Sequence, residues 1–221
     1  MKNVIFDLDG TLADTSADLI AAANGCFITL GVGALLDPIK DAKTAFAGGR
    51  AMLRLGFDRL DDKWDESDID REFPLLLGHY SDNIDTYTTL YPNVVAALET
   101  LKSRGYRLGI CTNKPVGLAE TLAQNLGIRP LFGALLGADS LPVRKPDPQH
   151  LLRTISDLGG SAARSALIGD TVTDRNAAKN ADVPCVLVTF GPDGQGVRDL
   201  APEAVLDHYD DLPDLMDRMI G

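Results

Sequence analysis

The chain has 221 residues, of which 45% are hydrophobic and 24% are charged, a composition typical of a globular protein with a sizeable core. Its formal net charge of −11 at pH 7 gives an overall field that repels phosphate backbones and anionic lipid surfaces. The charge therefore argues against a nucleic acid or a membrane as partner. An anionic small molecule would need local positive charge from a bound cation, a lysine or a helix N-terminus.

The cysteine pattern indicates a reducing compartment. Cys26, Cys111 and Cys185 lie far apart in the sequence, which argues against a disulfide framework or a structural zinc site. A four-residue apolar run precedes the first acids, which is too short for a signal-peptide core, and no stretch approaches the length of a membrane span. We expect a soluble, cytoplasmic protein.

The first predicted element is a strand in the run "NVIFDL" at 3–8, and a different pattern follows it. Between Asp14 and about Thr88 there is no convincing strand pattern. Helical spacing of apolar residues instead predicts helices at 16–30, 49–56 and 68–82. The sequence therefore predicts a small all-helical domain over 14–88, inserted after the first strand.

Strand and helix patterns alternate in the rest of the chain. The helices are predicted at 94–105, 117–128 and 150–160, and each ends at or beside a glycine. The apolar runs predict strands at 107–112, 133–138, 165–170, 184–189 and 203–207. This alternation predicts an α/β fold with a doubly wound parallel sheet, a Rossmann-like core formed by 1–13 and 89–221.

Two aspartates follow the first predicted strand. Asp7 and Asp9 lie at its carboxyl end, the edge at which ligand crevices form in open α/β sheets. Residues i and i+2 of an extended chain point the same way, so the two carboxylates are expected to lie close together. An Asp-Gly pair such as Asp9-Gly10 is more often a turn with a local backbone cap. This first pair alone leaves both interpretations open.

A second acidic pair favours the functional interpretation. Asp170 ends the apolar run at 165–170, and Asp174 follows where the helical pattern "TDRNAAKNA" begins. Asp174 could be an N-cap or a first-turn acid, but a cap does not explain Asp170. Carboxylates at two strand ends indicate a site for a hard cation with oxygen ligands, such as Mg²⁺.

Polar residues at two further sites complete the pattern. Thr112 and Asn113 end the run "GICTNK", and Lys145 lies in the proline-stiffened loop "VRKPDP". Alone, Thr112 would be interpreted as a strand-end cap and Lys145 as a solvated lysine. With the acids they make a site that offers a nucleophile, a metal, a hydroxyl donor and a cation.

The segments "DLDGTLADT", "CTNK", "RKPDP" and "GDTVTD" resemble the four ordered motifs of the haloacid dehalogenase-like superfamily phosphatases. The resemblance covers essentially the whole chain, with 14–88 in the place of that family's helical cap domain. The segment 91–114 is similar to the phosphoglycolate phosphatase branch. Asn93 stands where the family usually has glycine, and asparagine is among the few other residues that tolerate a left-handed backbone.

The resemblance implies roles for the two acids of the first motif. Asp7 would be the nucleophile that forms an aspartyl-phosphate, and Asp9 would be the general acid and later the general base. The implied Mg²⁺ ligands are Asp7, the backbone carbonyl of Asp9, and Asp170, with Asp174 a direct or indirect partner. Thr112 and Lys145 would hold the transferring phosphoryl oxygens. Further expected substrate contacts are Gly10, Thr11 and Asn113.

The segment "AFAGGRAML" in the expected cap is a candidate for substrate selection. Backbone amides beside Gly48 and Gly49 could bind an anion, and Arg50 could bind a substrate carboxylate in a forked geometry. The alternative is an interhelical turn followed by a surface arginine.

We expect a Mg²⁺-dependent phosphatase of a small organic phosphate ester, with 2-phosphoglycolate as the first candidate substrate. A β-phosphoglucomutase-like phosphomutase of the same fold, or a phosphatase of another sugar or short-chain phosphate, stays open because these enzymes share the core motifs. Asp9 argues against a dehalogenase, and the intact set of motifs argues against a non-catalytic binding module. The sequence makes no prediction of the oligomeric state.

Overall fold

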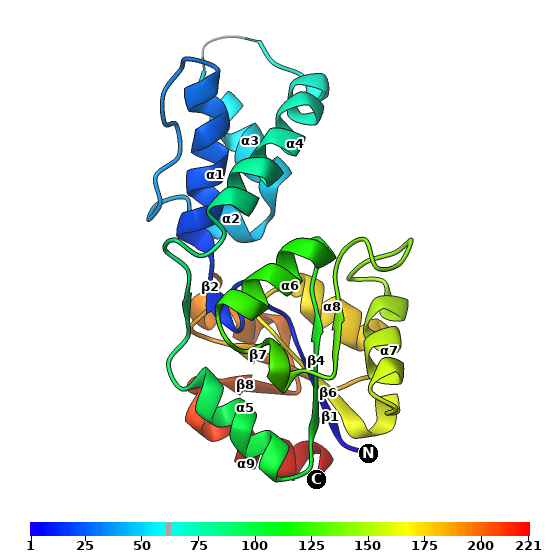
Figure 1. The fold of residues 1–221 in the computed structure, drawn as a ribbon. Coiled ribbons are helices and arrows are strands. Elements are labelled where there is room, and N and C mark those ends of the chain that lie inside the picture. The colour runs from blue at the N-terminus through cyan, green and yellow to red at the C-terminus, as the bar shows by residue number, and fades with distance from the viewer. Residues whose placement is uncertain (61–62) are drawn as a thin grey trace. The chain divides into compact units, whose positions relative to one another are not determined.

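This computed structural model describes residues 1–60 and 63–221 and contains two compact units. One unit comprises Met1–Asp14 with Leu90–Gly221, and the other comprises Thr15–Thr89 (Figure 1). The boundaries predicted for the helical insertion, 14–88, differ from those of the second unit by one residue at each end. The action of this unit as a cap stays a prediction. No helix in the described ranges combines the length and apolar character needed to cross a membrane.

The first unit is built around a parallel sheet. Among residues 1–60 and 63–221, six strands form this sheet in the order β5-β4-β1-β6-β7-β8, and every neighbouring pair is parallel. The predicted doubly wound parallel sheet is confirmed. The bounds of its strands are β1 Asn3–Phe6, β4 Arg107–Cys111, β5 Ala134–Leu136, β6 Ser165–Gly169, β7 Cys185–Val188 and β8 Ala204–Leu206.

Strand β1 lies inside the sheet between β4 and β6, and all four of its residues are buried. Ile5 pairs with Gly109 of β4 and with Leu167 of β6. A parallel strand covered on both faces has to be apolar throughout, which explains the uninterrupted run before Asp7. The carboxyl ends of β1, β4 and β6 therefore meet at one edge of the sheet.

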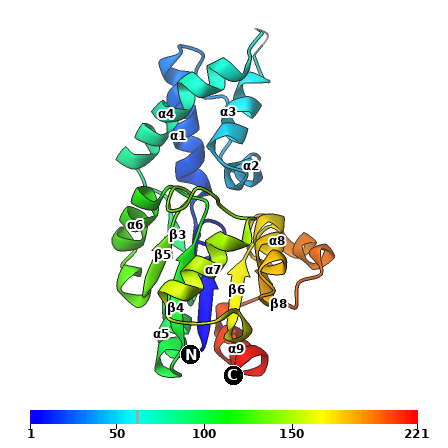
Figure 2. The same ribbon diagram turned by 90° about the vertical axis from the view of Figure 1, so that its right-hand side faces the viewer.

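Helices cover both faces of the sheet. Figure 1 shows α7 (Pro148–Asp157) and α8 (Val172–Asn180) on one side, and α5 (Val94–Ser103) and α9 (Leu212–Ile220) on the other. Figure 2, turned by 90°, places α7 in front of the sheet. Helix α6 (Val116–Asn125) packs beside β5. The core under α7 and α8 is apolar and includes Ile5, Leu151, Ile155, Leu167, Ala177 and Leu187.

The second unit is helical. Helix α1 (Ser16–Thr29) packs against α4 (Glu66–Asp82), and α2 (Ala42–Phe46) and α3 (Gly49–Phe57) complete the unit. The sequence did not predict α2, because a helix of five residues makes little more than one turn and cannot show a repeated apolar spacing. The buried carboxylate of Asp18 accepts hydrogen bonds from the backbone amides of Tyr87 and Thr88, which ties the start of α1 to the end of the unit. The short strands β2 (Ala13–Asp14) and β3 (Thr89–Leu90) form a two-stranded sheet.

Candidate active site

The loop after β1 carries Asp7 and Asp9 and turns tightly at Gly10. The carbonyl of Leu8 accepts hydrogen bonds from Leu12 and Ala13 at 2.9 and 3.2 Å, and the amide of Gly10 donates to the carbonyl of Ala13. Gly10 has a φ of +76°, and a Cβ there would lie 2.4 Å from Oδ2 of Asp170. Glycine is required at this position both for the backbone conformation and for the close approach of Asp170.

A buried lysine joins two of the acids. Nζ of Lys145 lies 2.9 Å from Oδ2 of Asp7 and 2.7 Å from Oδ1 of Asp174, and its side chain is only 1% exposed. Burial raises the pKa of Asp7 to about 6, although the charge of Lys145 opposes this effect. Burial alone would lower the pKa of Lys145. The negative charges of Asp174 and Asp7 outweigh this effect and raise the pKa of the lysine. The protonation of Lys145, Asp7 and Asp174 is therefore coupled, since each charge changes the pKa of its neighbours.

Asp170 and Asp174 are both buried but have different surroundings. Oδ1 of Asp170 accepts a hydrogen bond from the Thr11 hydroxyl at 2.7 Å, whereas its buried Oδ2 has no hydrogen-bond partner among the described residues. Burial, with repulsion from Asp174 and Asp7, raises the pKa of Asp170 well above its ordinary value. Burial alone would raise the pKa of Asp174 too. The charge of Lys145 and the hydrogen bonds from Lys145 and Thr171 instead hold this pKa below its ordinary value.

These acids fit a divalent cation. One carboxylate oxygen from each of Asp7, Asp170 and Asp174 lies within 4.8 Å of the others. The unpartnered Oδ2 of Asp170 is an oxygen ligand already stripped of water, and hard cations such as Mg²⁺ prefer such ligands. Both oxygens of Asp174 already accept hydrogen bonds, from Lys145 and from Thr171. Both oxygens of Asp7 are likewise engaged, by the amide of Leu8 and by Lys145, so Asp170 is the strongest candidate for a direct ligand.

A second lysine contacts Asp9, and the sequence analysis did not single it out. Nζ of Lys114 lies 2.7 and 3.0 Å from the two carboxylate oxygens of Asp9, and its side chain is 3% exposed. The signal was present in the motif "CTNK", because Lys114 follows Thr112 by two residues at a strand end. Each acid of the first motif thus contacts a lysine of its own.

Thr112 and Asn113 lie at the end of β4, beside the lysines. Thr112 is buried, and its hydroxyl oxygen accepts a hydrogen bond from the amide of Lys114 at 3.2 Å. Asn113 donates from Nδ2 to the carbonyl of Lys145 at 3.0 Å and so ties the two loops together. The predicted substrate contacts of Gly10, Thr11, Thr112 and Asn113 stay predictions. In the structure, the hydroxyl of Thr11 donates a hydrogen bond to Asp170.

Aromatic side chains support the loop after β1 from distant parts of the chain. The hydroxyl of Tyr209, which is 1% exposed, donates to the carbonyl of Thr11 at 2.8 Å. The ring of Phe190 packs between those of Tyr91 and Tyr209, at centroid distances of 4.9 and 5.3 Å. No local pattern links these residues to the first motif, and the sequence analysis missed them.

The two predicted cap residues lie in the helical unit. Gly49 begins α3, and a Cβ there would lie 3.0 Å from the ring of Phe73, which gives this glycine a packing role. Arg50 pairs with Asp70 at 2.7 Å and lies 4.9 Å from the centroid of the Phe73 ring. Binding of substrate by Gly49 and Arg50 stays a prediction.

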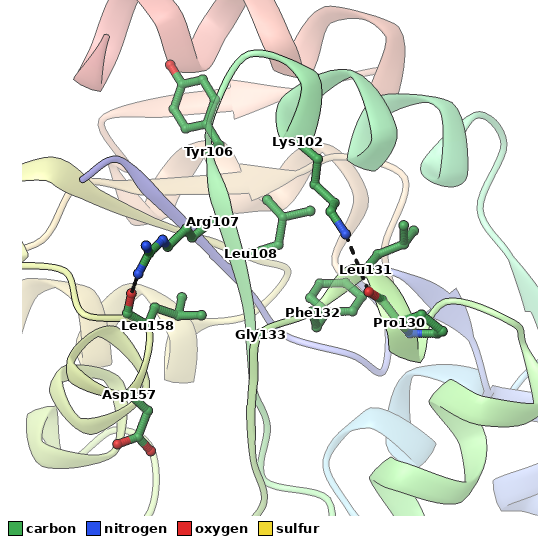
Figure 3. A pocket seen from close by; sticks show the side chains of 10 residues that line it. All are labelled: Lys102, Tyr106, Arg107, Leu108, Pro130, Leu131, Phe132, Gly133, Asp157 and Leu158. Carbon is green, nitrogen blue, oxygen red and sulfur yellow. Dashed lines mark hydrogen bonds between the residues drawn. The ribbon is translucent and has the colours of Figure 1, made fainter.

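A cavity of about 380 Å³ lies near the amino end of β4, away from these acids (Figure 3). Its lining is mixed polar and apolar, and its two cations already donate to backbone carbonyls. Lys102 donates to Pro130 at 3.4 Å, and Arg107 donates to Leu158 at 2.6 Å. The cavity includes none of the predicted site residues.

Comparisons with known proteins agree with this arrangement. The model of the haloacid dehalogenase-like hydrolase family matches residues 1–182. The chain is 38% identical to a phosphoglycolate phosphatase of Mesorhizobium japonicum over 98% of this chain and 96% of the relative. It is 36% identical to a phosphoglycolate phosphatase of Agrobacterium fabrum over 98% of this chain and 93% of the relative.

Solved structures share the fold. A protein from Haemophilus somnus, described as a predicted phosphoglycolate phosphatase, superposes with a TM-score of 0.87 at 26% identity and covers 97% of each chain. The matching family model extends over most of the chain, and the curated relatives match it nearly end to end. The chain therefore belongs to the haloacid dehalogenase-like hydrolase family.

Proposed function

We propose that this hydrolase of phosphoric monoesters is a Mg²⁺-dependent phosphatase that acts through an aspartyl-phosphate on Asp7, with 2-phosphoglycolate as its first candidate substrate. One observation carries the proposal: the Asp7 carboxylate contacts buried Lys145 and lies beside Asp170, whose Oδ2 has no partner in the described part of the chain. Relatives named phosphoglycolate phosphatase support the choice of substrate.

In the first step, a carboxylate oxygen of Asp7 attacks the phosphorus atom of the ester. The bond from phosphorus to the ester oxygen breaks, and Asp9 donates a proton to the departing oxygen. Lys145, 2.9 Å from Asp7, offsets the repulsion between the attacking carboxylate and the anionic phosphoryl group. This local positive charge is what an anionic substrate needs in a protein of net charge −11.

In the second step, water attacks the phosphorus atom of the aspartyl-phosphate. Asp9 accepts a proton from this water, the bond between phosphorus and the Asp7 oxygen breaks, and inorganic phosphate leaves. Asp7, Asp170 and the carbonyl of Asp9 would hold Mg²⁺, while Asp174 orients Lys145 through its 2.7 Å contact. The bound cation would supply positive charge beside the phosphoryl group.

We propose that the helical unit selects the substrate. A carboxylate-bearing ester such as 2-phosphoglycolate suits a guanidinium, and the side chain of Arg50 is 43% exposed. We place the enzyme in the cytoplasm, since Cys26, Cys111 and Cys185 are free thiols.

Release of inorganic phosphate from a panel of esters tests the proposal. The panel includes 2-phosphoglycolate and several hexose and triose phosphates, each with Mg²⁺ or with EDTA. We expect release that prefers 2-phosphoglycolate and that is lost with EDTA and in the Asp7→Asn variant. Isomerised sugar phosphates without free phosphate would identify a phosphomutase instead. Inertness towards every ester would contradict the proposal.

A further inference from the structure

The second lysine of the site, Lys114, contacts the acid that the proposed mechanism uses to move protons. Its Nζ lies 2.7 and 3.0 Å from the two oxygens of Asp9, and both side chains are largely withdrawn from water, at 3% and 19% exposure. We infer that Lys114 is a positioning residue that fixes the direction of the Asp9 carboxylate for proton transfer. This inference rests on the proposed function.

The chain holds the backbone of Lys114 firmly. Its amide donates to the hydroxyl of Thr112 at 3.2 Å, and its carbonyl accepts from the amide of Ala138 at 2.9 Å. A Cβ at Gly137 would lie 2.4 Å from the amide nitrogen of Val116 and 2.7 Å from the Lys114 carbonyl, so glycine permits this close packing. The lysine therefore starts from a fixed position at the end of β4.

The backbone of Asp9 is also fixed, and both oxygens of its carboxylate contact Lys114. Asp9 forms a backbone bridge with Ala13, and Gly10 donates to the carbonyl of Ala13. These bonds place the Cα of Asp9 and do not involve its carboxylate. A contact from one Nζ to both carboxylate oxygens restrains the side-chain torsions of Asp9 and links the ends of β1 and β4.

The two lysines of the site thus have separate tasks. Lys145 contacts Asp7 and Asp174, so it compensates charge at the nucleophile. Lys114 contacts Asp9, so it orients the group that gives a proton to the leaving oxygen and later takes one from water. Without Lys114, the partly exposed Asp9 carboxylate loses this two-oxygen restraint, and both proton transfers slow down.

Two substrates with different leaving groups separate this role from a merely structural one. An alkyl ester such as 2-phosphoglycolate needs the proton from Asp9 in the first step, whereas 4-nitrophenyl phosphate releases a stable phenolate without it. For Lys114→Met we expect kcat on 2-phosphoglycolate to fall about 100-fold, the loss typical of a misplaced acid-base group. On 4-nitrophenyl phosphate we expect a rapid burst of nitrophenolate equal to the enzyme concentration, followed by slow turnover, because only the second step then needs Asp9.

Asp9→Asn and the double variant complete the test. Lys114→Met combined with Asp9→Asn should be no slower than Asp9→Asn alone, because the lysine acts through that acid. Lys114→Arg should recover part of kcat, and the exposed lysine variant Lys102→Met should match the wild type.

Equal losses on both esters without a burst, or losses that add to those of Asp9→Asn, would overturn the role of Lys114 and leave the phosphatase function standing. A wild-type enzyme that hydrolyses neither ester would overturn both.

Discussion

Replacement of Lys145 by methionine is the most informative test of the charge balance in the site. Lys145 contacts Asp7 at 2.9 Å and Asp174 at 2.7 Å, and the three side chains are 1%, 14% and 0% exposed. Methionine keeps most of the side-chain volume but leaves two buried carboxylates uncompensated. Breaking a buried ion pair in this way costs about 3–5 kcal/mol of unfolding free energy. For a chain of this length, that cost lowers the melting temperature by about 6–20 °C.

The pH dependence of this loss follows from the pKa of Asp7. Burial raises that pKa to about 6, and Lys145 lowers it, so the pKa rises further when the lysine is removed. An acid whose pKa is raised in the folded state binds more protons there than in the unfolded chain. The free energy of unfolding therefore falls as the pH rises from the unfolded-state pKa to the folded-state pKa. In Lys145→Met this fall continues to higher pH than in the wild type. The gap in melting temperature between the two proteins should therefore widen from about pH 5 to about pH 8.

Calorimetry in EDTA, with Lys145→Met, Lys145→Met/Asp174→Asn and Lys102→Met side by side, measures this gap. The double variant should regain part of the lost stability, because it removes one uncompensated charge. The exposed Lys102 should be replaceable with little effect. A loss that is the same at both pH values, or that is no larger than the loss in Lys102→Met, would refute the reasoning.

Three further outcomes are expected. Gly10→Ala should destabilise the protein and reduce phosphate release, because the φ of +76° is strained for alanine and its Cβ would lie 2.4 Å from Oδ2 of Asp170; full activity would contradict the proposed packing. Mg²⁺ at about 100 times its Kd should stabilise the wild type by about 2.7 kcal/mol, or about 5–11 °C in thermal fluorimetry. That increase should disappear in Asp170→Asn, and an unchanged increase would remove Asp170 from the ligands. Arg50→Met should raise KM for 2-phosphoglycolate more than for glycerol phosphate, which has no carboxylate. The matched control is Arg54→Met, because Arg54 lies on α3 like Arg50 and forms a salt bridge to Glu66 of α4; it should affect both esters alike. Equal effects of Arg50→Met on the two esters would exclude carboxylate binding.

The sheet was predictable because its strands have simple local signals. Each of the six apolar runs contains a strand of the sheet, although the strands are one to three residues shorter than the runs. The shortening at β1 shows why: the predicted 3–8 ends at Phe6, because Asp7 and Leu8 already belong to the loop of the site. Asn93 adopts the left-handed backbone that its position suggested, with a φ of 64°.

The missed features depend on contacts between distant residues. Helix α2 has five residues and too little periodicity to be recognised. Tyr209 reaches Thr11 across 198 residues of sequence, and no local pattern carries that information. The ion pair from Lys114 to Asp9 likewise joins two strand ends 105 residues apart. The order of strands in the sheet, which puts β4 beside β1, creates this pair.

The glycine-rich loop at 191–196 also depends on contacts between distant residues. Gly191 follows β7, and a Cβ there would lie 2.7 Å from the carbonyl of Gly10 and 2.9 Å from Cβ of Asp170. In sequence, this glycine belongs to a loop without a phosphate-binding pattern. In the structure, its lack of a side chain allows three loops to close around Asp170.

Trapping of the covalent intermediate tests the central claim most directly. Asp9→Asn mixed with 4-nitrophenyl phosphate and Mg²⁺ should accumulate phosphorylated enzyme, because the first step needs no proton and the second lacks its base. Acid quenching, proteolysis and mass spectrometry should then place one hydroxylamine-sensitive phosphoryl group on the peptide that contains Asp7. A phosphoryl group on another residue, or nitrophenolate release without any phosphorylated enzyme, would contradict the assignment of Asp7 as the nucleophile.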